Sequence, residues 1–189
     1  MRAVRGGVTA PIFAMVRPRG GDFVYSAAEF EEMKQSIEVA RAAGMDGVVL
    51  GLLRGDRSVD VERTTELVRA AAPLPVTFHR AIDESAELFT ALEDVIATGA
   101  ARVLTSGAAA KAPDAVGQIA ELVRRAGSRL IVMPGSGITA ENAAEIASAT
   151  GAKELHAGLS SVVTGDAGVG VFEGEVRRLV KAAGKSALG

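Results

Sequence analysis

Six short apolar runs recur along the 189-residue chain and limit its fold more than any other feature. Each run is rich in Val, Ile and Leu and lacks strict apolar–polar alternation, as strands do when a parallel sheet buries both of their faces. Consecutive runs start 24 to 35 residues apart, which is the length of one strand followed by one helix. We therefore expect strands at 12–17, 47–53, 76–81, 102–106, 130–134 and 154–159.

The segments between these runs have the apolar spacing of helices. Ser26 followed by Glu29 is a capping-box pattern, and Gly44 is a typical residue at a helix end. Between them, helical spacing predicts one buried face made of Phe30, Met33, Ile37 and Ala40. We expect helices of the same kind after the other strands, closed by Gly99, Gly127, Gly151 and Gly184.

Strands that alternate with helices imply a parallel sheet with right-handed crossovers. A dinucleotide-binding sheet would carry G-x-G-x-x-G after its first strand, whereas the sequence there is RPRGGDF. Polar residues instead follow nearly every strand, as in a barrel whose site is formed by the loops after the strands. We therefore expect an α/β fold of the (β/α)₈ TIM-barrel type, in a single domain over residues 1–189.

The number of strand–helix units is smaller than a complete barrel requires. A TIM barrel has eight units in about 250 residues, and this sequence predicts six in 189. The opening MRAVRGG has the character of a helix end. We expect an N-terminally truncated barrel of about six units, without the first strand, its helix and the second strand. Two open strand edges would then favour a homo-oligomer.

The composition excludes several functional classes. A formal net charge of −2 argues against binding to nucleic acid or to an anionic membrane surface. No apolar run reaches the roughly 18 residues that a membrane-spanning helix needs. The sequence contains no cysteine, which rules out disulfides and thiolate metal ligands and fits a cytoplasmic protein.

Chemically capable side chains gather at the expected strand ends. Arg17 and Arg19 follow the first strand, while His79, Arg80 and Asp83 end the third. These arginines predict an anion-binding corner, with Asp22 or Tyr25 fixing them, although a purely structural ion network is the alternative. His79, His156 and Asp83 are the candidate catalytic residues; Asp83 is equally suited to a helix start. Candidate ligand-binding residues after the later strands are Ser106, Gly135, Ser136 and Gly137.

The segment PGSGITAEN after the fifth strand has the pattern of an anion site. Glycines allow backbone N–H groups to approach a ligand, and the N-terminus of a helix favours negative charge. Thr139 is placed to cap that helix. The loops after the last two strands of a barrel often bind phosphate, although a tight packing turn is the alternative.

Several motifs together resemble one family. FAMVRPRGGDFVYS, DGVVLGLL, LPVTFHRAID, RVLTSG and IVMPGSGI follow one another as they do in the CutC family, named for copper homeostasis. The resemblance implies a TIM-barrel fold, a cytoplasmic location and a link to copper handling. His79 and His156 are then the candidate copper ligands. Two histidines without cysteine would bind copper only weakly, because copper(I) prefers thiolate and thioether ligands.

Two functions are therefore expected for the strand ends. The first is a role in copper homeostasis with weak copper binding. The second is a barrel enzyme that acts on a small phosphorylated or carboxylated substrate, held by Arg17, Arg19 and Arg80, with His79 or His156 as general acid–base. The partner is a small anionic ligand or a copper ion.

Overall fold

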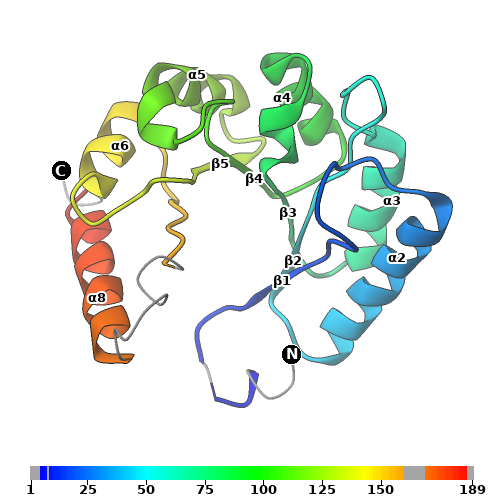
Figure 1. Cartoon of the computed structure of the whole chain (residues 1–189), viewed down its shortest axis with the longest axis horizontal. Coiled ribbons are helices and arrows are strands. Elements are labelled where there is room, and N and C mark those ends of the chain that lie inside the picture. Colours follow the sequence, from blue (N-terminus) through cyan, green and yellow to red (C-terminus); the bar gives the residue numbers. More distant parts are fainter. Residues whose placement is uncertain (1–4, 8, 160–168, 187–189) are drawn as a thin grey trace. The chain divides into compact units, whose positions relative to one another are not determined.

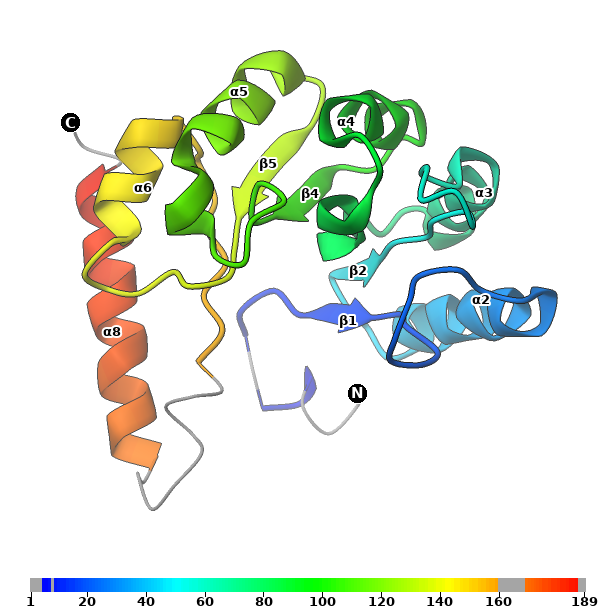
Figure 2. The same ribbon diagram turned by 45° about the horizontal axis from the view of Figure 1, so that its top comes forward.

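The structure is a computed structural model that describes residues 5–7, 9–159 and 169–186 (Figures 1 and 2). Strands and helices alternate along the chain, as the sequence predicts. The elements are β1 (Phe13–Met15), α2 (Ala27–Ala42), β2 (Gly47–Leu50), α3 (Val61–Ala71), β3 (Val76–Phe78), the 3₁₀ helix η1 (Arg80–Glu84), α4 (Leu88–Ala97), β4 (Arg102–Thr105), the 3₁₀ helix η2 (Ala112–Ala115), α5 (Val116–Ala126), β5 (Ile131–Pro134), α6 (Ala143–Thr150) and α8 (Val169–Ser186).

Five of the six apolar runs form one parallel sheet, with the strand order β1-β2-β3-β4-β5. Each strand therefore lies beside the next one in the chain, as right-handed crossovers within a barrel-type fold require. In β1 and β2 the register pairs Ala14 with Val48, and in β2 and β3 it pairs Val49 with Thr77. The observed strands are shorter than the apolar runs, because each run continues into the loop that carries the polar residues.

The prediction of a sixth strand over 154–159 is wrong, because these residues, all of which the structure describes, do not form a strand. That segment makes a single parallel bridge, between Gly135 and His156. The backbone N–H of His156 donates to the carbonyl of Pro134 at 2.9 Å.

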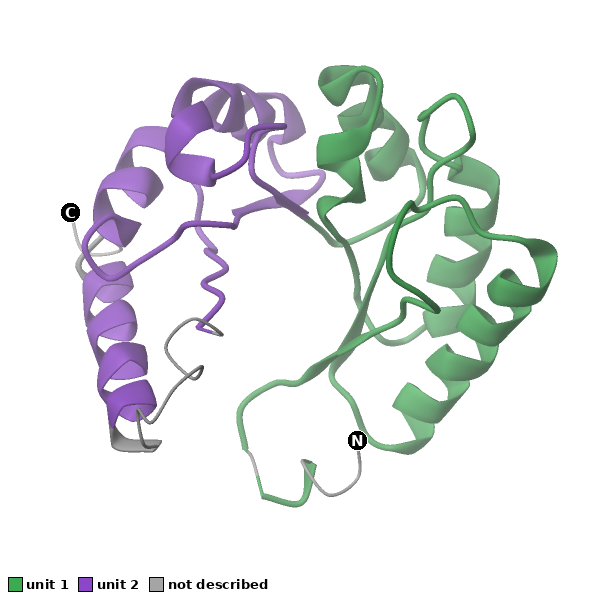
Figure 3. Cartoon of the chain, in the orientation of Figure 1, with its two compact units in different colours: residues 1–103 green, residues 104–189 purple. Residues whose placement is uncertain are grey.

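The chain divides into two compact units, residues 1–103 and 104–189 (Figure 3). In the first unit, α2 packs beside α3 and both lie on the same side of β1 and β2 (Figure 1). Its core is apolar and includes the fully buried Met33, Ile37, Val48 and Leu67. In the second unit, α6 packs against both α5 and α8.

Helix α2 forms as its sequence predicts. The Ser26 side chain accepts a hydrogen bond from the Glu29 N–H, and the Glu29 carboxylate accepts one from the Ser26 N–H, which completes the capping box. Gly44 follows the helix with φ of +71°, a left-handed conformation that glycine adopts without strain. The buried face of α2 consists of Phe30, Met33, Ile37 and Ala40.

Two predicted helix boundaries are wrong, the C-terminus of α8 and the N-terminus of α6. Helix α8 continues through Gly184 to Ser186, because a glycine near a helix end costs only about 1 kcal/mol. Helix α6 begins at Ala143, with Asn142 rather than Thr139 at its N-cap. The Asn142 side chain instead binds the preceding loop: its oxygen accepts from the Thr139 N–H at 2.8 Å and its nitrogen donates to the Gly137 carbonyl at 2.9 Å.

None of the helices in the described ranges combines the length and the apolar character that crossing a membrane would require.

Candidate functional site

The loop after β1 is organised around the Arg19 guanidinium. Its Nε donates to Glu29 Oε1 at 2.6 Å, and its Nη2 lies 2.9 Å from Asp22 Oδ1. The terminal nitrogens also donate to the carbonyls of Gly20, Asp22 and Val24, at 3.2, 3.3 and 2.7 Å. These five contacts equal the number of N–H donors on a guanidinium. Arg19 therefore shapes the loop, which is the structural role that the sequence left open for it.

Three hydrogen bonds hold this loop against the segment that runs from β2 into α3. The Leu53 N–H donates to the Phe23 carbonyl at 3.0 Å. Arg63 of α3 donates to the carbonyls of Tyr25 and Ser26, at 2.8 and 3.0 Å. The segment from Phe23 to Ser26 is thereby fixed from both sides.

Arg17 has a different environment from Arg19. Its guanidinium lies 4.6 Å from the centre of the Phe23 ring, and its Nη2 donates to the Gly21 carbonyl at 2.8 Å. The residue is exposed, and across the described ranges no carboxylate forms an ion pair with it. Its positive charge is available to an anion.

His79 follows β3 directly and is buried, with 4% of its surface exposed. Its Nδ1 accepts a hydrogen bond from the Ala81 N–H at 3.2 Å. The imidazole centre lies 4.9 Å from that of Phe23. Gly51 makes room for the ring, since a Cβ at position 51 would lie 2.5 Å from His79 Nδ1.

The environment of His79 keeps its imidazole neutral. Burial lowers the pKa of His79 to about 4, and the positive charge of Arg17 acts in the same direction. Because Nδ1 accepts a hydrogen bond, the proton of the neutral ring belongs on Nε2. At neutral pH, His79 is therefore better suited to donate a hydrogen bond than to act as a general base.

Two buried donors near Arg17 have no acceptor for their proton in the part of the chain that the structure describes: the Tyr25 O–H and the His79 Nε2–H. The Arg17 side chain lies beside the Tyr25 hydroxyl, where it can only donate to the phenol oxygen. Burial raises the pKa of Tyr25, while the charges of Arg17 and Arg19 oppose this change, so the phenol keeps its proton at neutral pH. An unsatisfied buried donor costs about 1–3 kcal/mol, and such groups in folded proteins call for an explanation. We name Arg17, Tyr25 and His79 the Arg17 corner.

Arg80 and Asp83 lie in η1, directly after His79. Arg80 Nε donates to Asp83 Oδ2 at 2.8 Å, and the Asp83 side chain is only 5% exposed. This ion pair gives both residues a structural role within η1. Their catalytic and ligand-binding roles stay predictions.

In the second unit, the serine side chains of the loops after β4 and β5 donate to backbone carbonyls of the loop after β4. Ser106 Oγ donates to the Ala109 carbonyl at 2.6 Å, and Ser136 Oγ donates to the Ala110 carbonyl at 3.0 Å. The Gly135 N–H donates to the Thr105 carbonyl at 2.9 Å, so it belongs to the sheet. These bonds fold the loops after β4 and β5 onto each other.

Lys111 is a neighbour of this loop that the sequence did not single out. Gly137 has φ of +74°, and a Cβ there would lie 3.0 Å from Lys111 Cβ. The lysine stem therefore lies against Gly137. No motif marks Lys111, since it is brought there by the fold of a loop 26 residues earlier in the chain.

His156 is exposed, although partial burial of its ring lowers its pKa. Within the ranges that the structure describes, no cluster of three or more His, Cys, Asp or Glu side chains is arranged to hold a metal ion. The chain has no cysteine, and burial and its tautomer both disfavour metal binding by His79. The described residues do not fit a tight copper site.

The candidate residues thus fall into two sets, one in each compact unit. Arg17, Arg19, His79, Arg80 and Asp83 lie in the first unit. Ser106, Gly135, Ser136, Gly137 and His156 lie in the second. Tyr25, whose buried hydroxyl is part of the Arg17 corner, was expected only to fix the arginines.

The fold and the polar side chains after its parallel strands define the class of protein: an α/β protein of the TIM-barrel type. A thiamine phosphate pyrophosphorylase of Pyrococcus furiosus shares this fold, with a TM-score of 0.58 at 18% identity, covering 100% of this chain and 89% of that one. The CutC family model matches residues 1–161, and the chain belongs to the CutC family.

Two similar proteins are members of that family. A CutC family protein of Chromobacterium violaceum is 52% identical over 153 residues, covering 81% of this chain and 62% of the relative. A crystal structure presented as the copper homeostasis protein CutC of Streptococcus agalactiae has a TM-score of 0.74 at 33% identity, covering 78% of this chain and 72% of that one. The chain spans about three fifths of the length of curated relatives such as the Chromobacterium violaceum protein.

Proposed function

We propose that this chain serves the copper-homeostasis role for which its Streptococcus agalactiae relative is named, and that it does so by binding a small carboxylate or phosphate at the Arg17 corner. The observation that carries this proposal is the pair of buried donors, Tyr25 Oη and His79 Nε2, beside the exposed charge of Arg17.

The three side chains offer one positive charge and two neutral donors. An arginine binds carboxylates and phosphates through charge-assisted hydrogen bonds. Hydroxyl and imidazole N–H groups bind the same oxygens without adding charge, and burial strengthens those bonds. The Arg17 corner therefore favours an oxyanion over a metal ion, which Arg17 would repel.

Copper binding is proposed to be weak. His156 is an exposed ligand, whereas His79 would have to move its proton to Nδ1 and release the Ala81 N–H before Nε2 could bind a metal. A cytoplasmic location fits a chain without cysteine. Self-association at the open edge of β1, where Met15 is 57% exposed, is the proposed oligomeric contact.

Anion binding is also the first step of the alternative function, an enzyme that acts on a small phosphorylated or carboxylated substrate. The neutral state of His79 favours hydrogen-bond donation to the substrate over proton abstraction. The two functions share the ligand chemistry and differ in whether turnover follows.

Thermal unfolding in phosphate, in acetate and in chloride at equal ionic strength tests the proposal. A ligand that binds only the folded state stabilises it by mass action, by about 2.7 kcal/mol at 100 times its Kd. We expect phosphate or acetate to stabilise the native chain more than chloride does. Arg17→Met and Tyr25→Phe should each remove most of this excess.

Thr64→Val is the matched control. Thr64 Oγ1 on α3 is also buried without a partner among the described residues, but it is not part of the Arg17 corner. This variant should keep the full anion response. The proposal is wrong if Arg17→Met and Tyr25→Phe retain it too, because the stabilisation would then be a general salt effect.

A further inference from the structure

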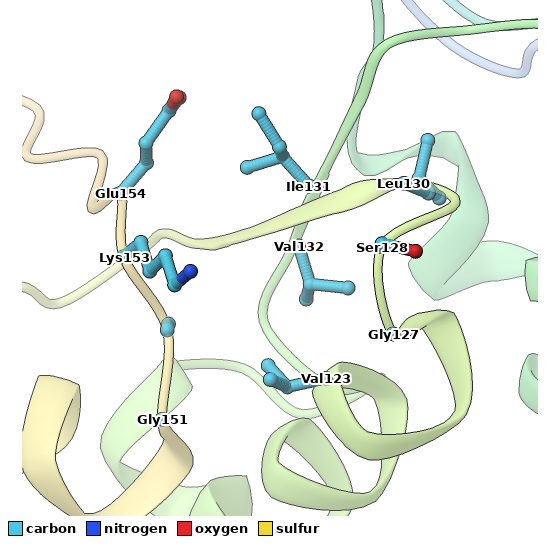
Figure 4. A pocket seen from close by; sticks show the side chains of 10 residues that line it. Val123, Gly127, Ser128, Leu130, Ile131, Val132, Gly151, Lys153 and Glu154 are labelled. Carbon is cyan, nitrogen blue, oxygen red and sulfur yellow. The ribbon is translucent and has the colours of Figure 1, made fainter.

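The second unit contains a cavity of about 310 Å³ far along the sequence from the Arg17 corner. One wall consists of Leu130 and the first two residues of β5, Ile131 and Val132 (Figure 4). The other wall is the segment after α6, which begins at Gly151 and includes Lys153. Val123 of α5 contributes to the floor.

The bridge between Gly135 and His156 shows how these walls are related. It sets an offset of 21 residues between β5 and the later segment. Continued toward the start of β5, the same register would place Val132 opposite Lys153 and Leu130 opposite Gly151. The cavity therefore occupies the place where these two segments would pair if the ladder continued.

Pro134 explains why the ladder does not continue. The His156 N–H donates to the Pro134 carbonyl at 2.9 Å. In a parallel ladder, the next bond toward the start of β5 would need the N–H of residue 134 to donate to the Glu154 carbonyl. Proline has no N–H and cannot supply this bond. The separation of the two segments is thus specified by the sequence.

The lining of the cavity is mostly aliphatic or glycine, and its polar members are Ser128, Lys153 and Glu154. Val123, Ile131 and Val132 present aliphatic side chains to it. In Figure 4 the Lys153 nitrogen points toward Val132 and Val123, whereas the Glu154 carboxylate points away from them. Lys153 forms no ion pair with any carboxylate that the structure describes. Its charge therefore lies beside apolar surface without a counter-ion.

We propose that this cavity is a binding site for a small aliphatic carboxylate. The carboxylate would pair with Lys153 Nζ, and the hydrocarbon chain would lie against Val123, Ile131 and Val132. The volume is at the lower end of the range for small-molecule sites, about 300–1,000 Å³. A ligand of this chemistry removes apolar side chains from water and neutralises the lysine in one step.

Titration of the native chain with hexanoate, followed by NMR shifts of the Ile131 and Val132 methyl groups, tests this proposal. We expect saturable shifts with hexanoate. Lys153→Met keeps the aliphatic stem and removes the charge, so hexanoate should bind at least ten times more weakly, while 1-hexanol should bind both proteins equally. Equal hexanoate affinity in the two proteins would overturn the proposal.

Pro134→Val gives an independent test of the cause of the cavity. This substitution restores the N–H that the ladder lacks, so the two segments should pair and the Glu154 N–H should become protected from hydrogen exchange. Binding of both hexanoate and 1-hexanol should then be lost. If amide protection rises and hexanoate still binds with native affinity, the ligand does not occupy the gap between the segments.

Discussion

Because His79 is buried, we expect the stability of the chain to change with pH in an interval that lies above the titration range of most carboxylates. The pKa of His79 is lowered from 6.5 to about 4 by burial and by Arg17. The unfolded state therefore takes up a proton at a higher pH than the folded state does. The stabilising contribution of neutral His79 is complete above the pKa of the unfolded state. It decreases as the pH falls toward the pKa of the folded state.

The size of this effect follows from the difference between the two pKa values. Each pKa unit corresponds to about 1.4 kcal/mol. Between about pH 7 and pH 4, the free energy of unfolding should therefore fall by about 3 kcal/mol because of His79 alone. Whole domains have free energies of unfolding of about 5–15 kcal/mol, so this loss is large enough to measure.

Urea unfolding at a series of pH values, with native chain and His79→Asn compared, measures this contribution. Asparagine retains an acceptor for the Ala81 N–H and does not titrate. The variant should be less stable at neutral pH, because it lacks the imidazole packing against Phe23. Since only the native chain loses the His79 contribution at low pH, the difference in stability between the two proteins should shrink as the pH falls. His156 supplies the comparison: partial burial lowers its pKa too, by less than at His79, so His156→Asn should flatten the pH profile less than His79→Asn does.

The reasoning fails if the native chain and His79→Asn lose stability in parallel between about pH 7 and pH 4. That result would mean that His79 titrates near its ordinary pKa and is open to solvent. It would also remove the argument that the ring is a neutral donor in the Arg17 corner.

Three further predictions concern single features of the structure. Arg19→Lys removes at least two of the five contacts, because lysine has three donors on one nitrogen. Amide exchange should rise at residues 20–24, while the stabilisation by anions should be retained. Gly137→Ala should destabilise the chain by about 1–2 kcal/mol, since φ is +74° there, and a chain of native stability would show that the loop relaxes. Titration with copper(I) and copper(II) should give at most micromolar affinity, reduced further in a His79→Asn/His156→Asn double variant; nanomolar affinity in that double variant would show that other ligands bind copper.

The sequence predicted the parallel strands and their helices well because both signals are local. Apolar runs without alternation mark buried strands, and the capping box of Ser26 and Glu29 fixes the start of α2. The sixth strand was wrong for a reason that is also local. Pro134 ends the fifth apolar run and lacks the N–H that pairing with Glu154, at the start of the expected strand, would need.

The roles within the candidate site were harder to predict, because they depend on contacts between distant residues. Arg17 and Arg19 belong to the same short motif, and only the fold shows that Arg19 is bound by Glu29 while Arg17 lies over Phe23. The placement of His79 at a strand end was confirmed, but its neutral state follows from burial against Phe23 and Gly51. No pattern in the sequence reports that burial.

The proposed anion site requires that His79 donates from Nε2 to an anion beside Arg17. Nitrogen-15 NMR of the imidazole, recorded at neutral pH with and without phosphate or acetate, tests it directly. We expect a neutral ring protonated at Nε2 in both samples. The Nε2 signal should shift when anion is added to the native chain and should not shift in Arg17→Met. A ring protonated at Nδ1, or an Nε2 signal that ignores the anion, would contradict it.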